Sequence, residues 1–487
     1  MSEERVDVAV VGAGVTGLSA AYTLASRRPE LSLRVFELRD RAGGNIRTDH
    51  VDGFLLDAGP DSFLRTKPHA TELCKELGLE SEFLTTRAEA RSVYIAHRGK
   101  LELMPAGMVL AVPTRLGPML KTRLLSLPAK LRVLGDVLLP KRSKPEGDES
   151  IAAFLTRRFG AEAAQRIGAP LLGGIYAGDI GTLSMRATFP QLPELEERWG
   201  SVIYGLFAAQ LARREPNGSE RRADQGSLSR ARALLSWMRR ESDHAPSPFL
   251  SLRSGLGSLI ERLTERLPEG ALRTGVGVET IEREGTSFRL RTSAGSLVAR
   301  GVILAAPAHA AARMLPLGKL HAELAAIPYV STATVFFALS ERGLERPLDG
   351  VGFIVPPGEG RILAGTWISS KWEDRAPAGS VLVRAFVGGS RSPEVLAQSD
   401  ADLVTMAKDE LERLMGGLGA PLFSRVYRYQ DSNPQPTVGH PERLARIRAE
   451  LGALPGLELA GAAYDGVGIP DCVRQARASA EAVLGRL

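Results

Sequence analysis

A short apolar run followed at once by closely spaced glycines opens the chain and constrains the fold more than any other feature. The run is VDVAVV, the glycines are Gly12, Gly14 and Gly17 in the pattern GxGxxG, and LSAAYTLASRR follows with helical spacing. A second apolar run, LSLRVFEL, ends near Glu37, twenty residues after Gly17. Gly12 permits a tight turn, Gly14 lets the backbone approach a pyrophosphate, and Gly17 lets helix and strand pack closely. The sequence therefore predicts a βαβ unit that binds a dinucleotide, with Glu37 as acceptor for a ribose hydroxyl.

Further glycine turns favour FAD as that dinucleotide. RAGGNIRT follows Glu37, GFLLDAGPDSF comes soon after, and YDGVGIPD opens the last helix. An NAD domain usually needs only the first motif, whereas turns that converge from both chain ends indicate a longer ligand whose ring system also needs a site. The cofactor-binding residues predicted from these turns are Gly12, Ala13, Gly14, Val15, Thr16, Gly17, Glu37, Leu38, Gly43, Gly44, Asn45, Gly59, Pro60, Asp61 and Ser62.

The fold class that follows is α/β, with a discontinuous Rossmann-type FAD-binding domain, a mixed-sheet substrate domain and a helical insertion. The expected ranges are 1–88, 249–306 and 431–487 for the FAD-binding domain, 89–107, 196–248 and 307–430 for the substrate domain, and 108–195 for the helical insertion. Within these ranges, 194–243 is rich in Arg and Glu and predicts a solvated helix, a loop and another helix.

Composition excludes several classes of function. The net charge is +6, but no run of five Lys or Arg occurs and no zinc-finger or RNP pattern is present, so nucleic acid is not an expected partner. Cys74 and Cys472 form no CxxC and the histidines are scattered, so neither a disulfide framework nor a metal site is expected. No secretion signal and no run of about twenty apolar residues is found, which predicts a cytoplasmic protein.

The segment 104–140 mixes apolar residues with Lys121, Arg123, Lys130 and Arg132 and is broken by prolines into short amphipathic helices. Two interpretations stay open. The segment is a basic, apolar face that lies on an anionic membrane, or it is a helical lid over the core whose charges are in water.

A cluster of glycines, GAPLLGGIYAGDIG from Gly168 to Gly181, lies within an apolar run. Glycine allows close approach of the main chain to a neighbour, so this backbone is expected to come near a large or tightly held object.

The chain as a whole resembles the flavoprotein family of protoporphyrinogen oxidase and coproporphyrinogen III oxidase. The segments that carry the resemblance are VVGAGVTGL, FELRDRAGGNIRT, DAGPDSF, APLLGGIYAGDIGTLSMRATFP, GTWISSKWEDRAP, FVGGSR, DSNPQPTVGH and AGAAYDGVGIPDC. The first turns are typical of the wider amine-oxidase-like superfamily, whereas GIYAGD together with VGGSR and VGH is selective for porphyrinogen oxidases. The resemblance implies that the Gly174 backbone faces the substrate macrocycle, with its carbonyl oxygen toward positive charge developing on a pyrrole carbon. The alternative is that Gly173 and Gly174 cap a helix.

The resemblance also implies further site residues. Arg91 matches the position that pairs with a substrate propionate, and the alternative is an ordinary surface arginine. Ile354 and Trp372 match positions that pack against the macrocycle, although the family often has Phe near Trp372, and the alternative for both is ordinary core packing. Pro436 replaces a common aromatic residue, and His440 is expected to hold a loop near the flavin. The cofactor contacts implied in this way are Val278 on the adenine side and Val467, Gly468 and Ile469 beside the flavin.

The expected activity is FAD-dependent oxidation of protoporphyrinogen IX to protoporphyrin IX in haem biosynthesis, in three two-electron rounds with oxygen as acceptor. Oxidation of coproporphyrinogen III, as in Gram-positive bacteria, is the alternative, and another amine-oxidase-like flavoprotein or a non-catalytic binding protein of the same fold is more remote. No side chain is expected to act as acid, base or nucleophile, because the flavin carries the chemistry. The expected partners are the porphyrinogen, an anionic membrane surface on the cytoplasmic face, and the next enzyme of the haem pathway. The chain is expected to be a monomer or a homodimer.

Overall fold

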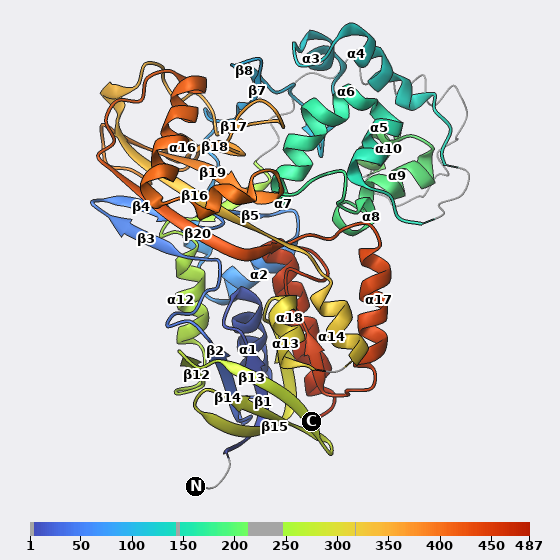
Figure 1. Cartoon of the computed structure of the whole chain (residues 1–487), viewed down its shortest axis with the longest axis vertical. Coiled ribbons are helices and arrows are strands. Elements are labelled where there is room, and N and C mark those ends of the chain that lie inside the picture. Colours follow the sequence, from blue (N-terminus) through green and yellow to red (C-terminus); the bar gives the residue numbers. More distant parts are fainter. Residues whose placement is uncertain (1–3, 143–146, 213–246, 317) are drawn as a thin grey trace.

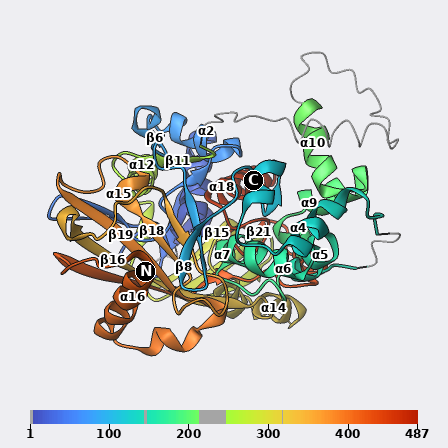
Figure 2. The same cartoon turned by 90° about the horizontal axis from the view of Figure 1, so that it is seen from above.

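Two seven-stranded sheets and a helical unit make up the protein (Figure 1). The computed structural model describes residues 4–142, 147–212, 247–316 and 318–487. In Figure 1 the first sheet lies at the bottom, the second at the upper left and the helical unit at the upper right. Figure 2 shows the second sheet and the helical unit side by side, with α7 (Gly174–Tyr176) between them. The mixed α/β class predicted from the sequence is confirmed.

The first sheet has the strand order β12-β2-β1-β15-β14-β13, and β21 pairs with β15. Its strands are β1 (Glu4–Val11), β2 (Leu33–Glu37), β12 (Leu272–Thr274), β13 (Val278–Glu284), β14 (Ser287–Thr292), β15 (Gly295–Leu304) and β21 (Leu457–Leu459). β1 runs parallel to both β2 and β15. Its apolar run is continuous because helices or strands cover both of its faces, as buried parallel strands require.

Helices on the two faces of this sheet come from distant parts of the chain. They are α1 (Val15–Arg27), α2 (Pro68–Glu76), α12 (Gly257–Glu265) and α18 (Ile469–Leu484) on one face, and α13 (Ala308–Met314), α14 (Gly318–Ala325) and α17 (His440–Leu451) on the other. The sequence analysis placed 307–430 in the substrate domain. The structure instead packs α13 and α14 on the first sheet, because Ala311, Leu320 and Leu324 share a core with Val302 of β15.

The second sheet has the order β20-β16-β19-β18-β17-β7-β8. Its strands are β7 (Val93–His97), β8 (Lys100–Leu103), β16 (Tyr329–Ser340), β17 (Gly352–Ile354), β18 (Ala364–Trp367), β19 (Ser380–Gly388) and β20 (Phe423–Pro434). The helix α16 (Asp400–Met415) covers one face through a large apolar core. The opposite face packs Phe336 and Leu382 against Phe54 and Leu56 of the first domain. This second face is the one that meets the N-terminal part of the chain.

Smaller elements connect the two sheets. They are the hairpin of β3 (Thr48–Val51) and β4 (Phe54–Asp57), the three-stranded sheet of β5 (Phe63–Leu64), β11 (Phe249–Leu252) and β6 (Phe83–Thr85), and the short helices η1 (Glu80–Glu82), η4 (Glu341–Gly343), α15 (Ile368–Lys371), η5 (Gly389–Arg391) and η6 (Pro393–Ala397).

The helical unit has its own apolar core. Its elements are β9 (Met108–Val109), β10 (Val112–Pro113), α3 (Leu116–Lys121), α4 (Leu127–Leu134), η2 (Gly135–Val137), α5 (Ile151–Phe159), α6 (Ala161–Ala163), η3 (Ala164–Gly173), α7, α8 (Met185–Thr188), α9 (Gln191–Trp199) and α10 (Val202–Ala212). The sequence analysis ended this unit at residue 195 and expected a solvated helix next. The structure extends the unit through α10, because Val202, Ile203 and Phe207 are buried in the same core. The rest of that prediction, 213–243, lies outside the described residues.

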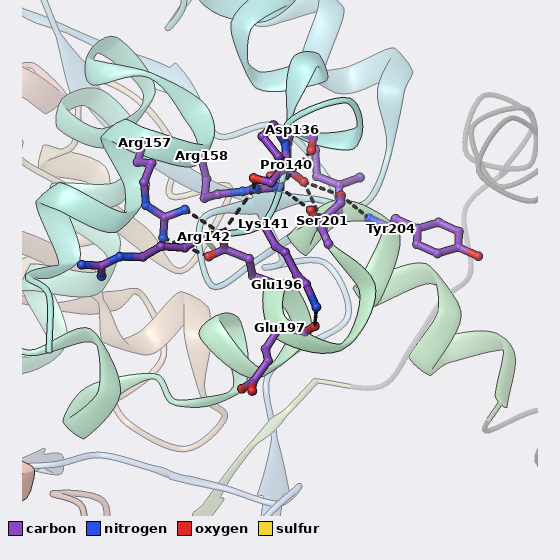
Figure 3. Close-up of polar contacts among 12 residues, drawn as sticks. Asp136, Pro140, Lys141, Arg142, Arg157, Arg158, Glu196, Glu197, Ser201 and Tyr204 are labelled. Atoms are coloured by element: carbon purple, nitrogen blue, oxygen red, sulfur yellow. Dashed lines mark hydrogen bonds and ion pairs between the residues drawn. The ribbon is translucent and has the colours of Figure 1, made fainter. Parts of the chain in front are cut away.

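A buried ionic network joins α5, η2 and the start of α10 (Figure 3). The guanidinium of Arg158, 1% exposed, donates to the Asp136 carboxylate at 2.6 Å and lies 3.4 Å from Glu196. The other carboxylate oxygen of Asp136 accepts from the Ser201 hydroxyl at 2.6 Å and from the Ile203 N–H at 3.0 Å. Since both charges are paired and hydrogen-bonded, the network holds these elements in one arrangement.

Candidate functional site

The glycines of the first turn differ in why glycine is required. The fold itself requires glycine at Gly12 and Gly17, whereas at Gly14 it has room for a side chain. Gly12 has φ +100°, and a Cβ on Gly17 would lie 1.8 Å from the Gly12 carbonyl oxygen. A Cβ on Gly14 would meet only the Cα of Gly44, at 3.9 Å. The protein therefore leaves space beside Gly14, as the approach of a pyrophosphate requires.

Glu37 lies at the end of β2, directly beside this turn. Its carboxylate accepts one hydrogen bond from the Ala13 N–H at 2.9 Å and another from the Arg39 N–H at 3.0 Å. These bonds fix the carboxylate and leave further lone pairs for a ribose hydroxyl. Gly14 is the residue that precedes α1, and no side chain in the described structure caps this end of the helix. The first N–H groups of α1 are therefore available to an anion.

The second glycine turn lies against the first. Gly43 donates from its N–H to the Ala13 carbonyl at 2.7 Å, and Gly14 and Gly43 form an isolated parallel bridge. Arg41 was not predicted from the sequence, yet its guanidinium donates to the Gly44 carbonyl at 2.9 Å. Burial lowers the pKa of Arg41, and the neighbouring charges of Arg39 and Arg47 add to that effect. The turn thus carries a concentration of positive charge suited to a pyrophosphate.

Three further residues that were predicted to bind the cofactor, Leu38, Val278 and Asn45, differ in burial. The Leu38 side chain is 76% exposed and lies over Gly277, where a Cβ would approach it to 2.8 Å. Val278 opens β13 and is buried in the core beneath the sheet. Asn45 is half-buried, and its carbonyl fits against Gly59, where a Cβ would lie 2.0 Å away.

The loop 57–62 is fixed on the second sheet by charged side chains. Arg384 of β19 donates to the carbonyls of Asp57 and Gly59, each at 2.9 Å, and lies 3.1 Å from the Asp61 carboxylate. Lys371 lies 3.0 Å from the same carboxylate, which also accepts from the Ser62 hydroxyl at 2.8 Å. Asp61 was predicted to bind the cofactor, but the structure gives its carboxylate to this network. The Asp61 carboxylate holds the Arg384 guanidinium, which in turn donates to the Gly59 carbonyl.

Burial and neighbouring charges shift the pKa values of the acids and the lysine in this network. Burial by itself would raise the pKa of Asp61, but the charges of Lys371 and Arg384 outweigh it and hold that pKa well below its usual range. Burial lowers the pKa of Lys371, and Asp61 opposes the shift. Asp57 differs, since burial raises its pKa even though Arg375 opposes the change.

Trp372 is a correction to the sequence analysis, which placed it against a substrate. Its ring is 0% exposed and belongs to the core between β4 and the second sheet. Its indole N–H donates to Asp61 at 3.4 Å, and the Lys371 ammonium lies 4.9 Å from the ring centre. A side chain with no free surface has none to offer a macrocycle.

Phe386, which the sequence analysis did not name, lies on the same sheet face as Ile354. Ile354 of β17 pairs with Ala364 of β18, which pairs with Phe386 of β19. Residues paired in this way share one face of a sheet. Phe353 and Val355 point into the core under α16, so the half-buried Ile354 and Phe386 share the opposite face. The only sequence signal for Phe386 is the strand pattern within RAFVGG, in which successive side chains point to opposite faces of the sheet.

Arg91 lies at one end of the same part of the sheet. It is exposed and precedes β7, whose Ile95 pairs with Ile354. The next residue, Ser92, accepts at its carbonyl from the Val351 N–H at 2.9 Å. The Arg91 guanidinium has no hydrogen bond or ion pair with any residue that the structure describes. It is therefore available to a carboxylate.

Three separate sequence motifs meet around the turn that follows α7. Gln435 donates its side-chain amide to the Tyr176 carbonyl at 2.8 Å, and Ser390 donates its N–H to the Ala177 carbonyl at 2.9 Å. A Cβ on Gly178 would lie 2.2 Å from the Gln435 side-chain oxygen, and one on Gly389 would lie 2.5 Å from the Ala177 carbonyl oxygen. GIYAGD, VGGSR and PQPTVGH are thus parts of one structure.

Gly174 lies on an open side of this structure. A Cβ there would meet nothing within 4 Å, whereas one on Gly173 would lie 3.0 Å from the Gly178 carbonyl oxygen. Both glycines have right-handed helical angles, and Ala177, with φ 48°, ends the helix. Gly174 directly follows η3 and Gly173 directly precedes α7, so both glycines lie where the two helices join, and the alternative that they cap a helix stays open. The Gly174 carbonyl accepts from the Ala177 N–H at a long 3.3 Å.

The last glycine turn brings the C-terminal segment to the same region. Val467 packs against the core of the helical unit, and Gly468 caps α18, which begins with the buried Ile469. His440 is buried, and its ring lies near the backbone of Ala463 and Tyr464, just ahead of this turn. Burial lowers the pKa of His440, with the charge of Arg443 adding to the shift, so its imidazole is neutral at neutral pH.

The glycine turns, the fixed Glu37 and the free first turn of α1 fit FAD and define a flavin-dependent oxidoreductase. In the part of the chain that the structure describes, no group of three His, Cys, Asp or Glu is arranged to hold a metal ion. Within this class the chain belongs to the family of flavin containing amine oxidoreductases, which matches residues 15–484.

Individual relatives are similar over nearly the whole chain. The chain is 34% identical to the coproporphyrinogen III oxidase of Bacillus subtilis, over 98% of each protein. It is 30% identical to the chloroplastic protoporphyrinogen oxidase of Nicotiana tabacum, over 99% of this chain and 86% of that one. A solved structure from Exiguobacterium sp. 255-15, provisionally assigned as a protoporphyrinogen oxidase, superposes with a TM-score of 0.82 at 34% identity over 99% of both chains. FAD is thus the cofactor, as predicted.

Proposed function

We propose that this flavoprotein oxidises coproporphyrinogen III to coproporphyrin III, with oxygen as the acceptor. The observation that carries the proposal is the full-length similarity to the Bacillus subtilis enzyme. It favours the alternative in the sequence analysis over protoporphyrinogen IX, which was preferred there. When bound, FAD would supply the redox chemistry, that is, a hydride acceptor for a bridging carbon of the porphyrinogen.

The residues of this chain bind and orient the substrate. The macrocycle lies against Ile354 and Phe386, and Arg91 binds a propionate in the forked geometry that guanidinium provides. The open backbone at Gly174 receives the other side of the ring, with its weakly bonded carbonyl toward developing positive charge. The network of Asp61, Lys371 and Arg384 holds the loop between the cofactor domain and this surface.

Turnover of two porphyrinogens tests the proposal. The purified protein, in air, is supplied with coproporphyrinogen III or protoporphyrinogen IX, and porphyrin fluorescence is followed against an enzyme-free control. We expect kcat/KM for coproporphyrinogen III to exceed that for protoporphyrinogen IX by about tenfold or more. A preference for protoporphyrinogen IX would overturn the substrate. Bound flavin with no turnover of either compound would indicate another oxidoreductase of the family.

We also propose that the outer face of α3 and α4 lies on an anionic membrane. Leu127, Leu131 and Leu138 are 67%, 60% and 87% exposed, and the exposed Lys121 and Arg123 lie nearby in the chain. Leu127 and Leu131, four positions apart on α4, share one side of it. In Figure 1 the helices α3 and α4 are at the edge of the molecule farthest from the first sheet.

Two further observations limit the membrane proposal. Arg132 is not part of the surface, because it donates to the carbonyls of Arg157 and Arg158. No helix in the described part of the chain combines the length and apolar composition that crossing a bilayer requires. The proposed association is therefore peripheral.

Co-sedimentation with vesicles tests this surface. At low salt we expect the protein to sediment with phosphatidylglycerol vesicles, and the double variant Leu127→Gln/Leu131→Gln to bind about tenfold more weakly because apolar contact is lost. Leu422→Gln, at a site 60% exposed next to the second sheet, is the matched control and should bind as the unmodified protein does. Protein that stays in the supernatant at low salt would refute the surface.

A further inference from the structure

Arg391 is a half-buried guanidinium that has no carboxylate partner among the residues that the structure describes. It ends η5, in the VGGSR motif, and donates to the Val355 carbonyl at 2.8 Å. The structure gives it no ion pair with any described residue. Burial lowers the pKa of this guanidinium. Arginines withdrawn from water are normally paired, because an unpaired buried charge is costly.

The position of Arg391 is fixed by the same contacts that build the substrate surface. Ser390, its neighbour, donates to the Ala177 carbonyl in the turn after α7. Val355 directly follows Ile354, the residue on the substrate-facing side of β17. Arg391 therefore lies where the turn after α7 meets the end of β17.

Arg91 and Arg391 lie at opposite ends of β17. The Arg91 end is marked by Val351, which is bonded to Ser92, and the Arg391 end by Val355. With a rise of about 3.3 Å per residue, Val351 and Val355 are about 13 Å apart. That separation is on the scale of a tetrapyrrole with its propionates, and Ile354 lies between the two ends.

We propose that Arg391 binds a second propionate, on the edge of the macrocycle opposite the one that Arg91 binds. This inference rests on the proposed function and names what selects the substrate. Coproporphyrinogen III carries a propionate on each of its four pyrroles, so both edges are anionic. Protoporphyrinogen IX carries its two propionates on neighbouring pyrroles, so only one edge is. A cation at each end of β17 selects the first compound.

The test compares Arg391→Gln and Arg91→Gln with both porphyrinogens. We expect Arg391→Gln to raise the KM for coproporphyrinogen III about 10- to 100-fold, equivalent to about 1.4–2.8 kcal/mol, with little change in kcat. The KM for protoporphyrinogen IX should stay within about twofold, whereas Arg91→Gln should raise both. Arg391→Lys should restore part of the loss, because it keeps the charge without the fork.

Controls separate binding from folding. Arg361→Gln removes an arginine that is paired with Glu410 on the α16 side of the second sheet, and it should change neither KM. Fluorescence titration with coproporphyrin III and protoporphyrin IX gives the same comparison without turnover. An unchanged KM for coproporphyrinogen III in Arg391→Gln, or equal losses for both substrates, would overturn the role of Arg391 alone. An unmodified enzyme that oxidises neither porphyrinogen would overturn the proposed function and this inference with it.

Discussion

Asp136→Ala is expected to destabilise the helical unit by about 3–5 kcal/mol, because it leaves the Arg158 guanidinium buried without its main partner. Arg158 is 1% exposed and donates to Asp136 at 2.6 Å (Figure 3). The same substitution removes the acceptor for the Ser201 hydroxyl and the Ile203 N–H. Domains are stable by only about 5–15 kcal/mol, so the loss is a large share of the total. Urea unfolding followed by far-ultraviolet circular dichroism should show the first transition at a clearly lower urea concentration.

Two variants give this prediction its controls. Asp400→Ala removes an ion pair to Arg428 in which the acid is 66% exposed, and it should cost no more than about 1 kcal/mol. The pair replacement Asp136→Leu/Arg158→Met removes both charges and should recover much of the stability. A single Asp136→Ala that unfolds like Asp400→Ala would show that the buried pair does not hold the unit together.

Gly14→Ala is expected to weaken FAD binding at least about tenfold while leaving the protein folded. A Cβ at this position meets no atom of the protein nearer than the Gly44 Cα at 3.9 Å, so the fold has room for it. The same Cβ would occupy space that the structure leaves beside the turn for the pyrophosphate. Flavin absorbance per polypeptide after dialysis, and titration of the apoprotein with FAD, measure the effect.

Gly17→Ala is the matched comparison. Its Cβ would lie 1.8 Å from the Gly12 carbonyl oxygen, so this variant should lose both thermal stability and flavin. Loss of flavin from both variants with loss of stability only in Gly17→Ala would confirm the different roles of the two glycines. Retention of FAD with unchanged affinity by Gly14→Ala would contradict the assignment of the pyrophosphate to this turn.

The features that could be predicted from the sequence are those that depend on local motifs. GxGxxG, Glu37 and the later glycine turns identified the cofactor domain and its cofactor, because each motif acts through backbone angles or through bonds between residues close to the same turn. The α/β class followed from the same pattern. Domain boundaries were less accurate, since α13, α14 and α10 join their units through apolar contacts that no local signal marks.

Long-range packing decides which residues lie on the surface that we propose for the substrate. Trp372 matched a substrate position in the sequence but lies fully buried, while Phe386 shares a sheet face with Ile354 only because β17, β18 and β19 pair in a particular register. Asp61 lies in a predicted cofactor motif, yet Lys371 and Arg384, more than 300 residues away, engage its carboxylate.

The sequence by itself determined that this protein is a discontinuous FAD-binding α/β flavoprotein, because backbone conformation at a few glycines depends on residue type alone. Only the tertiary structure decided which arginines, among the described residues, form no ion pair with a carboxylate. The charge environment of Arg91 and Arg391 depends on strands and turns that are distant in sequence and adjacent in space. The burial and ion pairing of a side chain depend on that spatial arrangement, so they could not be predicted from the order of residues alone.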